Sequence, residues 1–86
     1  MHVSISGFVQ GVGFRYFVLR IAEGLSINGW VRNCADGRVE VLAQGREIDL
    51  RILLEDLRKG PMRSAVADVR VTWEESENVF QTFEIR

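Results

Sequence analysis

Residues 7–15 read Gly7-Phe8-Val9-Gln10-Gly11-Val12-Gly13-Phe14-Arg15 and join two segments with different hydrophobic periodicities. In the preceding segment apolar and polar side chains alternate, which predicts a β-strand with Val3, Ile5 and Val9 on one face and Ser4 and Ser6 on the other. The following segment has the spacing of a helix with one apolar stripe, formed by Phe14, Phe17, Val18, Ile21, Ala22 and Leu25. The nonapeptide is therefore predicted to be a strand-to-helix loop.

This loop has the features of an anion site. Gly11 and Gly13 can adopt backbone conformations closed to other residues, so that successive N–H groups turn toward one point. The first N–H groups of a helix have no intrahelical partners and carry the positive end of the helix dipole. Arg15 adds a planar fork of donors that matches a phosphate group. We expect a phosphate ligand, held by Arg15 and by the amides of Gly11, Val12, Gly13 and Phe14.

Length, composition and charge limit the class of protein. With 86 residues, 47% of them hydrophobic and 27% charged, we expect one globular domain spanning residues 1–86. The formal net charge of −1 argues against a nucleic-acid-binding module, which usually presents a basic face. No apolar run approaches the ~20 residues that cross a bilayer, so no membrane partner is expected. We expect a monomer.

The N-terminus and the cysteine content indicate in which cellular compartment the protein is expected. Cys34 is the only cysteine, which excludes an intrachain disulfide. The chain starts directly with a predicted strand, without a basic region followed by an apolar signal segment. These features predict a cytoplasmic protein.

The first helix is followed by a predicted β-hairpin. We expect the helix to end at Gly24, a position that favours a left-handed cap, and a second strand to occupy residues 27–33. The turn signal Ala35-Asp36-Gly37 then predicts a hairpin with a third strand, whose alternating apolar residues are Val39, Val41 and Ala43.

A second helix and two strands complete the chain. The helix is predicted from the apolar residues Ile48, Leu50, Leu53, Leu54 and Leu57. Its charges suit the helix dipole, with acidic Glu47 and Asp49 in the first turn and basic Arg58 and Lys59 in the last. A fourth strand is expected around Val69, Val71 and Trp73. A polar connection at residues 74–78 then leads to a short last strand with Phe83 and Ile85.

The predicted order is βαββαβ with a short extra C-terminal strand. Two helices packed on one face of a mainly antiparallel sheet make a ferredoxin-like two-layer sandwich of the α+β class. In a βαβ unit the two parallel strands end at the same edge, so Asn33 should lie beside the glycine loop. If the third strand lies between them, ~10 Å separates the two backbones, which leaves room for Arg15, Asn33 and one phosphate.

Two stretches resemble the signatures of the acylphosphatase family, small enzymes that hydrolyse the carboxyl-phosphate anhydride of acyl phosphates. They are residues 7–15 and Gly29-Trp30-Val31-Arg32-Asn33, in the family's order. The resemblance covers essentially the whole chain and implies the same fold. It also implies that Arg15 binds the phosphoryl group and that Asn33 orients the attacking water. Many relatives carry a hydroxyl residue where this chain has Cys34.

An acyl phosphate is therefore the expected substrate, with inorganic phosphate and sulfate as competing anions. We expect no metal, because no Cys/His cluster has ligand spacing, and no cofactor. His2, the only histidine, is expected at a frayed N-terminus without a nearby carboxylate and outside catalysis. Cys34 has no histidine to activate it and is predicted to be a packing residue, and Asp36 to belong to the turn.

The remaining residues of the two signatures are predicted to have structural roles. Phe8, Val9, Val12 and Phe14 are expected to pack the loop in place. We expect Trp30 to cover a helix or a sheet edge, and Arg32 to be solvated.

Other functions fit the sequence less well. Residues 11–17 are similar to the aromatic string of RNA-recognition domains, but that string belongs on the third strand, and residues 38–44 contain no aromatic residue. A Gly-x-Gly turn also occurs in dinucleotide-binding loops, but Tyr16 takes the place of the third glycine. The better alternative is a non-catalytic module that binds acyl or carbamoyl phosphate, because acylphosphatase-like domains occur inside larger proteins that handle carbamoyl phosphate.

Overall fold

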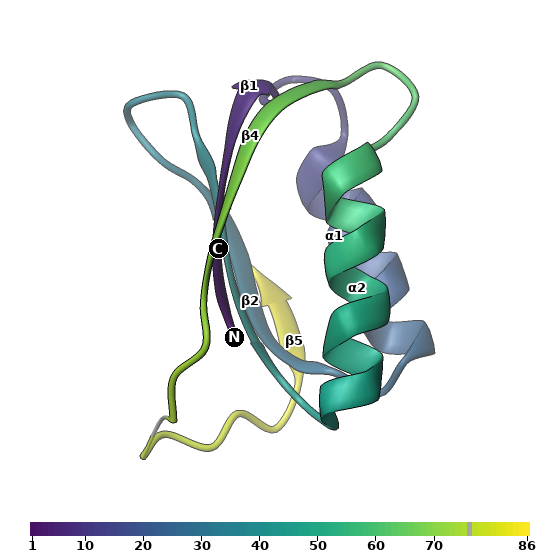
Figure 1. Ribbon diagram of the computed structural model, residues 1–86, viewed down its shortest axis with the longest axis vertical. Helices are drawn as coiled ribbons and strands as arrows, with labels where there is room; N and C mark the ends of the chain where they lie inside the picture. Colours follow the sequence, from purple (N-terminus) through teal and green to yellow (C-terminus); the bar gives the residue numbers. More distant parts are fainter. Residues whose placement is uncertain (76) are drawn as a thin grey trace.

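The computed structural model describes residues 1–75 and 77–86. Its elements are β1 (His2–Phe8), α1 (Phe14–Gly24), β2 (Asn28–Asn33), β3 (Val39–Gln44), α2 (Glu47–Lys59), β4 (Ala65–Thr72) and β5 (Phe83–Ile85). Both helices lie against the same face of the sheet (Figure 1). The predicted order, βαββαβ with a short last strand, is confirmed.

The five strands form one mixed sheet in the order β4-β1-β3-β2-β5. β3 pairs antiparallel with both β1 and β2 and so lies between them, as the predicted site requires. β1 also pairs antiparallel with β4, whereas β5 pairs parallel with β2. The ferredoxin-like α+β sandwich is therefore confirmed. The position of β5, which the sequence pattern left open, is the sheet edge beside β2.

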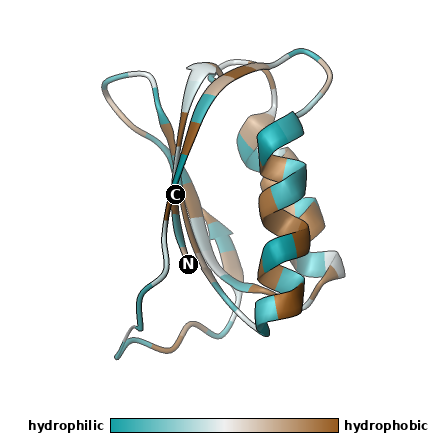
Figure 2. Cartoon of the chain, viewed as in Figure 1, coloured by the Kyte–Doolittle hydropathy of each residue, from teal (hydrophilic) through white to brown (hydrophobic). Residues whose placement is uncertain are grey.

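The hydrophobic core fills the space between the sheet and the helices. Alternate residues of the strands face it, among them Val3, Ile5, Val31, Val39, Val41 and Ala43. The buried helix residues are Phe14, Val18 and Ala22 from α1 and Leu50, Leu53, Leu54 and Leu57 from α2. Hydrophobic and hydrophilic residues accordingly alternate along both helices (Figure 2). Burying these apolar surfaces orients both helices, and so positions the loop that begins α1.

Two helix details differ from the sequence predictions. Gly24 does not adopt the left-handed cap conformation; Ser26 does, with φ at +56°. The N–H of Ile27 bonds to the carbonyl of Ala22 at 2.9 Å, so the reversal of the chain falls two residues after the helix end. Ile48 is 64% exposed, because it lies two residues before Leu50 and so on the opposite side of α2 from the buried stripe.

The ends of two predicted segments also differ. Phe8 does not pack the loop and is 62% exposed, because the alternation of β1 places it with Ser4 and Ser6 on the side opposite the buried Val3 and Ile5. β4 ends at Thr72, so Trp73 lies just outside it and is exposed. The predicted polar connection at 74–78 contains residue 76, which lies outside the described residues. No described helix is long and apolar enough to cross a membrane.

Candidate active site

The glycine loop runs from the end of β1 to the start of α1. Gly11 and Gly13 have φ values of +74° and +79°, in the left-handed region that other residues rarely adopt. A Cβ at either position would meet open space, so glycine is required here for its backbone conformation and not for lack of room. Val9 and Phe14 are buried and fix the two ends of the loop. The loop conformation is therefore held by the core, as predicted for these two residues.

The first turn of α1 has no side-chain cap and no acidic residue. Its N-cap residue is Gly13. α2 differs, because Glu47 and Asp49 occupy its first turn. The start of α1 therefore keeps the unpaired N–H groups and positive potential of a helix N-terminus without an internal carboxylate to neutralise them.

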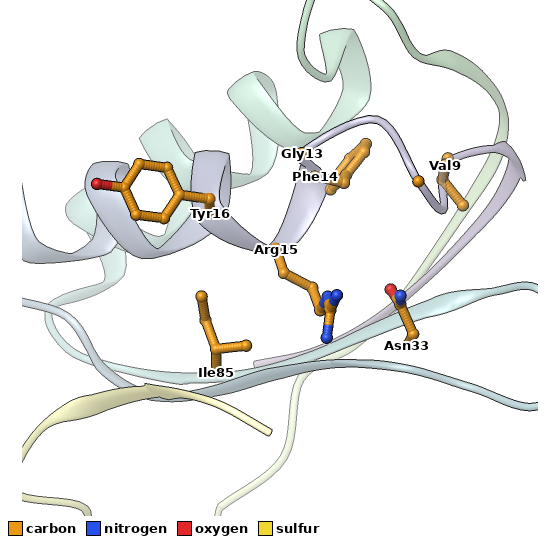
Figure 3. A pocket seen from close by; sticks show the side chains of 8 residues that line it. Val9, Gly13, Phe14, Arg15, Tyr16, Asn33 and Ile85 are labelled. Atoms are coloured by element: carbon orange, nitrogen blue, oxygen red, sulfur yellow. The ribbon is translucent and has the colours of Figure 1, made fainter.

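A pocket of about 210 Å³ opens beneath this loop, lined by Val9, Gly11, Gly13, Phe14, Arg15, Tyr16, Asn33 and Ile85. Figure 3 shows the guanidinium of Arg15 reaching from α1 toward Asn33, whose amide points up from β2 toward the loop. The structure thus brings together most of the residues predicted to form the site. Val12 does not line the pocket; its side chain packs against the hydrophobic core, as predicted, and its assigned part in the site is that of its backbone amide.

Arg15 and Asn33 are not engaged elsewhere in the described part of the chain. Within residues 1–75 and 77–86, Arg15 forms no ion pair and the Asn33 amide no hydrogen bond. Other arginines of the chain do pair; Arg38 and Arg46, for example, lie 2.7 and 2.9 Å from the carboxylates of Asp36 and Asp49. Arg15 is exposed and Asn33 partly buried. Both are therefore available to a ligand.

Gln10 connects the loop to the end of β2, a role that the sequence analysis missed. Its Nε2 donates to the carbonyl oxygens of Cys34 and Arg38, at 2.8 and 3.0 Å. Cys34 directly follows Asn33, and its own N–H donates to the Arg38 carbonyl at 2.8 Å. One side chain thus links the segment that carries Arg15 to the segment that carries Asn33. A glutamine between two glycines of a loop was the only sequence signal for this contact.

Sequence reasoning also missed Tyr16 and Ile85 as pocket residues. Ile85 reaches the pocket because β5 pairs parallel with β2, opposite Val31. Tyr16 follows Arg15 in the first turn of α1 and is 60% exposed. The Tyr16 ring and the Ile85 side chain add apolar surface beside Arg15 and Asn33.

The turn after β2 carries a carboxylate that is neutralised locally. Asp36 accepts hydrogen bonds from the backbone N–H and the Nε of Arg38, at 3.2 and 2.7 Å, which confirms its place in the turn. The side-chain hydrogen bond from Arg38 lowers the pKa of Asp36. Its negative charge therefore stays paired with Arg38.

His2 differs from its prediction. It lies in β1, and its Nε2 is 2.6 Å from Oε2 of Glu40, so it has the carboxylate partner that it was expected to lack. Glu40 also accepts from Nε of Arg32 at 2.6 Å. Burial raises the pKa of Glu40, but the hydrogen bonds from His2 and Arg32 outweigh it and lower this pKa. Arg32 in turn lies over the ring of Trp30, 5.2 Å from its centroid, and is therefore not merely solvated.

The cluster of His2, Arg32 and Glu40 lies away from the pocket. His2 and Glu40 alternate with the core residues Val3 and Val41, so they lie on the sheet face away from the helices. Among the described residues, no group of three or more His, Cys, Asp or Glu could hold a metal ion. Cys34 is a partly buried free thiol.

The fold and the pocket define a class: a small α+β sandwich with a pocket, lined by an arginine and an asparagine, where a glycine loop meets a helix. The family model for acylphosphatase matches residues 1–85. Acylphosphatases of Moorella thermoacetica and Chlorobaculum tepidum are similar, with 48% and 46% identity over 99% of this chain and 90% and 92% of theirs. The crystal structure of acylphosphatase from Bacillus subtilis superposes with a TM-score of 0.95 at 42% identity, covering 99% of this chain and 94% of that one.

A larger protein contains a similar unit. The crystal structure of full-length HypF in its phosphate- and nucleotide-bound form matches with a TM-score of 0.87 at 27% identity, over 99% of this chain but 11% of HypF. With family, relatives and structures in agreement, the chain belongs to the acylphosphatase family. Its activity is the hydrolysis of acyl phosphates to a carboxylate and inorganic phosphate.

Proposed function

We propose that this hydrolysis takes place in the pocket between the glycine loop and the end of β2, with Arg15 binding the phosphoryl group and Asn33 orienting the attacking water. The observation that carries the proposal is that these two side chains, 18 positions apart in the sequence, line one pocket and have no ion pair or side-chain hydrogen bond within the described residues. An arginine and an amide left unpaired beside one another are suited to a charged ligand and a water.

The loop supplies the rest of the phosphate site. The amides of Gly11, Val12, Gly13 and Phe14 surround the phosphoryl oxygens, and the positive end of the α1 dipole adds to the attraction. Arg15 completes this phosphate-binding loop with two parallel donors. The same groups bind inorganic phosphate and sulfate, so both anions compete with the substrate.

The chemistry of the substrate explains why so few groups suffice. Water oxygen attacks phosphorus, the bond from phosphorus to the acyl oxygen breaks, and its electron pair leaves with the carboxylate. The proton of the water passes to the phosphate product or to solvent. A carboxylate is a weak base and needs little protonation as it leaves, so positioning and charge stabilisation carry most of the rate enhancement. This reaction requires no covalent intermediate and no metal ion.

We also infer that residues 1–86 act as one domain and as a monomer, because this one segment contains the core and both halves of the pocket. We place the protein in the cytoplasm, where a lone, partly buried thiol such as that of Cys34 stays reduced. The second candidate is a non-catalytic module that binds acyl or carbamoyl phosphate, favoured by the similarity to one part of HypF. Turnover by the purified chain distinguishes the two.

The experiment compares Arg15→Ala and Asn33→Ala with the wild type, measuring phosphate Kd and kcat for acetyl phosphate. Loss of charge-assisted bonds should weaken phosphate binding by Arg15→Ala roughly 10- to 100-fold and also lower kcat. Asn33→Ala should lower kcat on the order of 10²-fold with little change in Kd, because the water contributes nothing to holding phosphate. The matched control is Asn28→Ala at the other end of β2, whose amide bonds to the Phe80 carbonyl at 3.0 Å. It should keep normal turnover.

The outcomes separate the roles. If Asn33→Ala turns over normally, or loses phosphate binding as severely as Arg15→Ala, the water-orienting role is wrong. If the wild-type chain binds phosphate but hydrolyses no acyl phosphate, the non-catalytic module replaces the enzyme. Even Arg15→Lys should bind phosphate poorly, because one ammonium cannot replace a planar fork of donors.

A further inference from the structure

A second hollow adjoins the phosphate pocket along the outer side of α1. It has a volume of about 470 Å³ and is lined by Gly13, Tyr16, Phe17, Arg20 and Ile21. Gly13 and Tyr16 also line the phosphate pocket, so the two spaces meet at the first turn of the helix. We call this second space the α1 hollow. The roles proposed above for Arg15 and Asn33 do not use it.

The walls of the α1 hollow combine fixed apolar surface with one cation. Phe17 and Ile21 are partly buried and pack against the core, which holds them in place. The guanidinium of Arg20 lies 6.0 Å from the centroid of the Tyr16 ring. Tyr16 is one helical turn nearer than Arg20 to the phosphate pocket. Within residues 1–75 and 77–86, Arg20 forms no ion pair. The α1 hollow therefore combines the apolar surface of Phe17 and Ile21 with the positive charge of Arg20, which pairs with no carboxylate in the described residues.

The direction of the reaction points the acyl group toward this hollow. Phosphoryl transfer places the attacking and leaving oxygens roughly in line on opposite sides of phosphorus. With the water held by Asn33, the leaving carboxylate lies on the side away from Asn33. In Figure 3 Arg15 lies between Asn33 and Tyr16, which places Tyr16 on the leaving-group side. Tyr16 also lines the α1 hollow, so the hollow begins on that side.

We propose that the α1 hollow is the acyl-group subsite and that Arg20 makes it selective for acyl phosphates whose acyl chain ends in a carboxylate. The methylene groups of such a chain pass Tyr16 and lie on Phe17 and Ile21, and the terminal carboxylate pairs with Arg20. A short acyl group such as acetyl ends before it reaches Arg20. The inference rests on the proposed positions of the phosphoryl group and the water. Arg20 is then a specificity-determining residue.

The test uses two substrates of equal chain length, succinyl phosphate and butyryl phosphate, which differ in the terminal carboxylate alone. Acetyl phosphate serves as the short reference. We expect Arg20→Gln to lower kcat/KM for succinyl phosphate roughly three- to tenfold and to leave the values for butyryl and acetyl phosphate within twofold. The control is Arg70→Gln, which removes one positive charge from an exposed arginine of β4 paired with Asp68. It should leave the succinyl-to-butyryl ratio of kcat/KM unchanged.

A second variant tests the apolar wall. Tyr16→Ala should lower kcat/KM for butyryl and succinyl phosphate more than for acetyl phosphate, because the longer chains alone pass the ring. If Arg20→Gln leaves the succinyl-to-butyryl ratio unchanged, or Arg70→Gln lowers it as much, Arg20 does not select the acyl group. Failure of the subsite is distinguishable from failure of the proposed active site. If only the subsite is wrong, the wild type, Arg20→Gln and Arg70→Gln still hydrolyse acetyl phosphate, and Asn33→Ala still lowers kcat for this substrate.

Discussion

Gln10 should set the rate of hydrolysis without touching the substrate. Its Nε2 donates to the carbonyls of Cys34 and Arg38, at 2.8 and 3.0 Å, and so ties the glycine loop to the residue after Asn33. Gln10→Ala removes both bonds and leaves the β2–β3 pairing in place. The distance between Arg15 and Asn33 then depends on the flexibility of two loops. We predict that this variant loses activity mainly through kcat.

The size of the effect follows from these contacts. A neutral hydrogen bond contributes about 1 kcal/mol net, and both bonds are partly buried, so the free energy of unfolding should fall by about 1–2 kcal/mol. In a domain of this size that corresponds to a decrease in Tm of about 4–16 °C. Displacing a catalytic group by ~1 Å can lower the rate ~10²-fold. Loss of the two Gln10 hydrogen bonds leaves the core of both elements in place, so we expect kcat to fall roughly tenfold.

The assay measures kcat and KM for acetyl phosphate, phosphate Kd and thermal unfolding on the same preparations. Gln44→Ala is the matched control, because Gln44 also makes two side-chain bonds, donating to the Asn78 carbonyl at 2.6 Å and accepting from the Phe80 N–H at 3.0 Å. It should lose comparable stability and keep its kcat. The positioning role is refuted if Gln10→Ala keeps wild-type kcat below its Tm, or if Gln44→Ala loses kcat equally.

Three further predictions test the mechanism and the fold. A chelator should leave turnover unchanged; loss of activity that a divalent cation restores would contradict the metal-free reaction. Cys34→Ala should keep kcat within a few-fold, because no covalent intermediate forms, and abolished turnover in a folded variant would count against this. Burial raises the pKa of Glu40, but the hydrogen bonds from His2 and Arg32 outweigh it and lower this pKa in the folded protein. The ionised Glu40 therefore stabilises the fold above its ordinary pKa of 4.5, and this stabilisation is lost as the pH falls through the lower pKa of the folded state. The difference in the free energy of unfolding between wild type and Glu40→Gln should therefore shrink at acid pH, and a constant difference would refute the argument.

Local patterns were enough to predict the order of elements and the centre of the site. Alternation of apolar residues marked the strands, and their helical spacing marked α1 and α2, because each element has one face against a single core. The parallel βαβ unit then predicted that Asn33 would lie beside the glycine loop, and the structure places both in one pocket. Errors arose at single residues, as at Phe8, which lies on the same side of β1 as Ser4 and Ser6 and is exposed although it was expected to pack the loop.

The long-range polar contacts were not predictable in the same way. His2 pairs with Glu40, which lies 38 residues away in the sequence. Gln10 donates to the carbonyls of Cys34 and Arg38, which lie 24 and 28 residues away. Periodicity indicates which side of an element is buried, because the hydrophobic effect depends on area and not on direction. A hydrogen bond depends on the position of two specific atoms, which only the packed elements fix.

By itself, then, the sequence of this chain determined the βαββαβ sandwich, the glycine loop with its left-handed backbone, and the presence of Arg15 and Asn33 in one pocket. The tertiary structure decided that β5 lies beside β2 and brings Ile85 to the pocket, and that Gln10 connects the two halves of the pocket. It also decided that a hollow continues along α1, lined by Arg20, which has no ion pair within the described part of the chain. The first set follows from local conformational preference and burial, which each segment carries in its own residues. The second depends on which segments become neighbours, and that is settled only when all of them pack on one core.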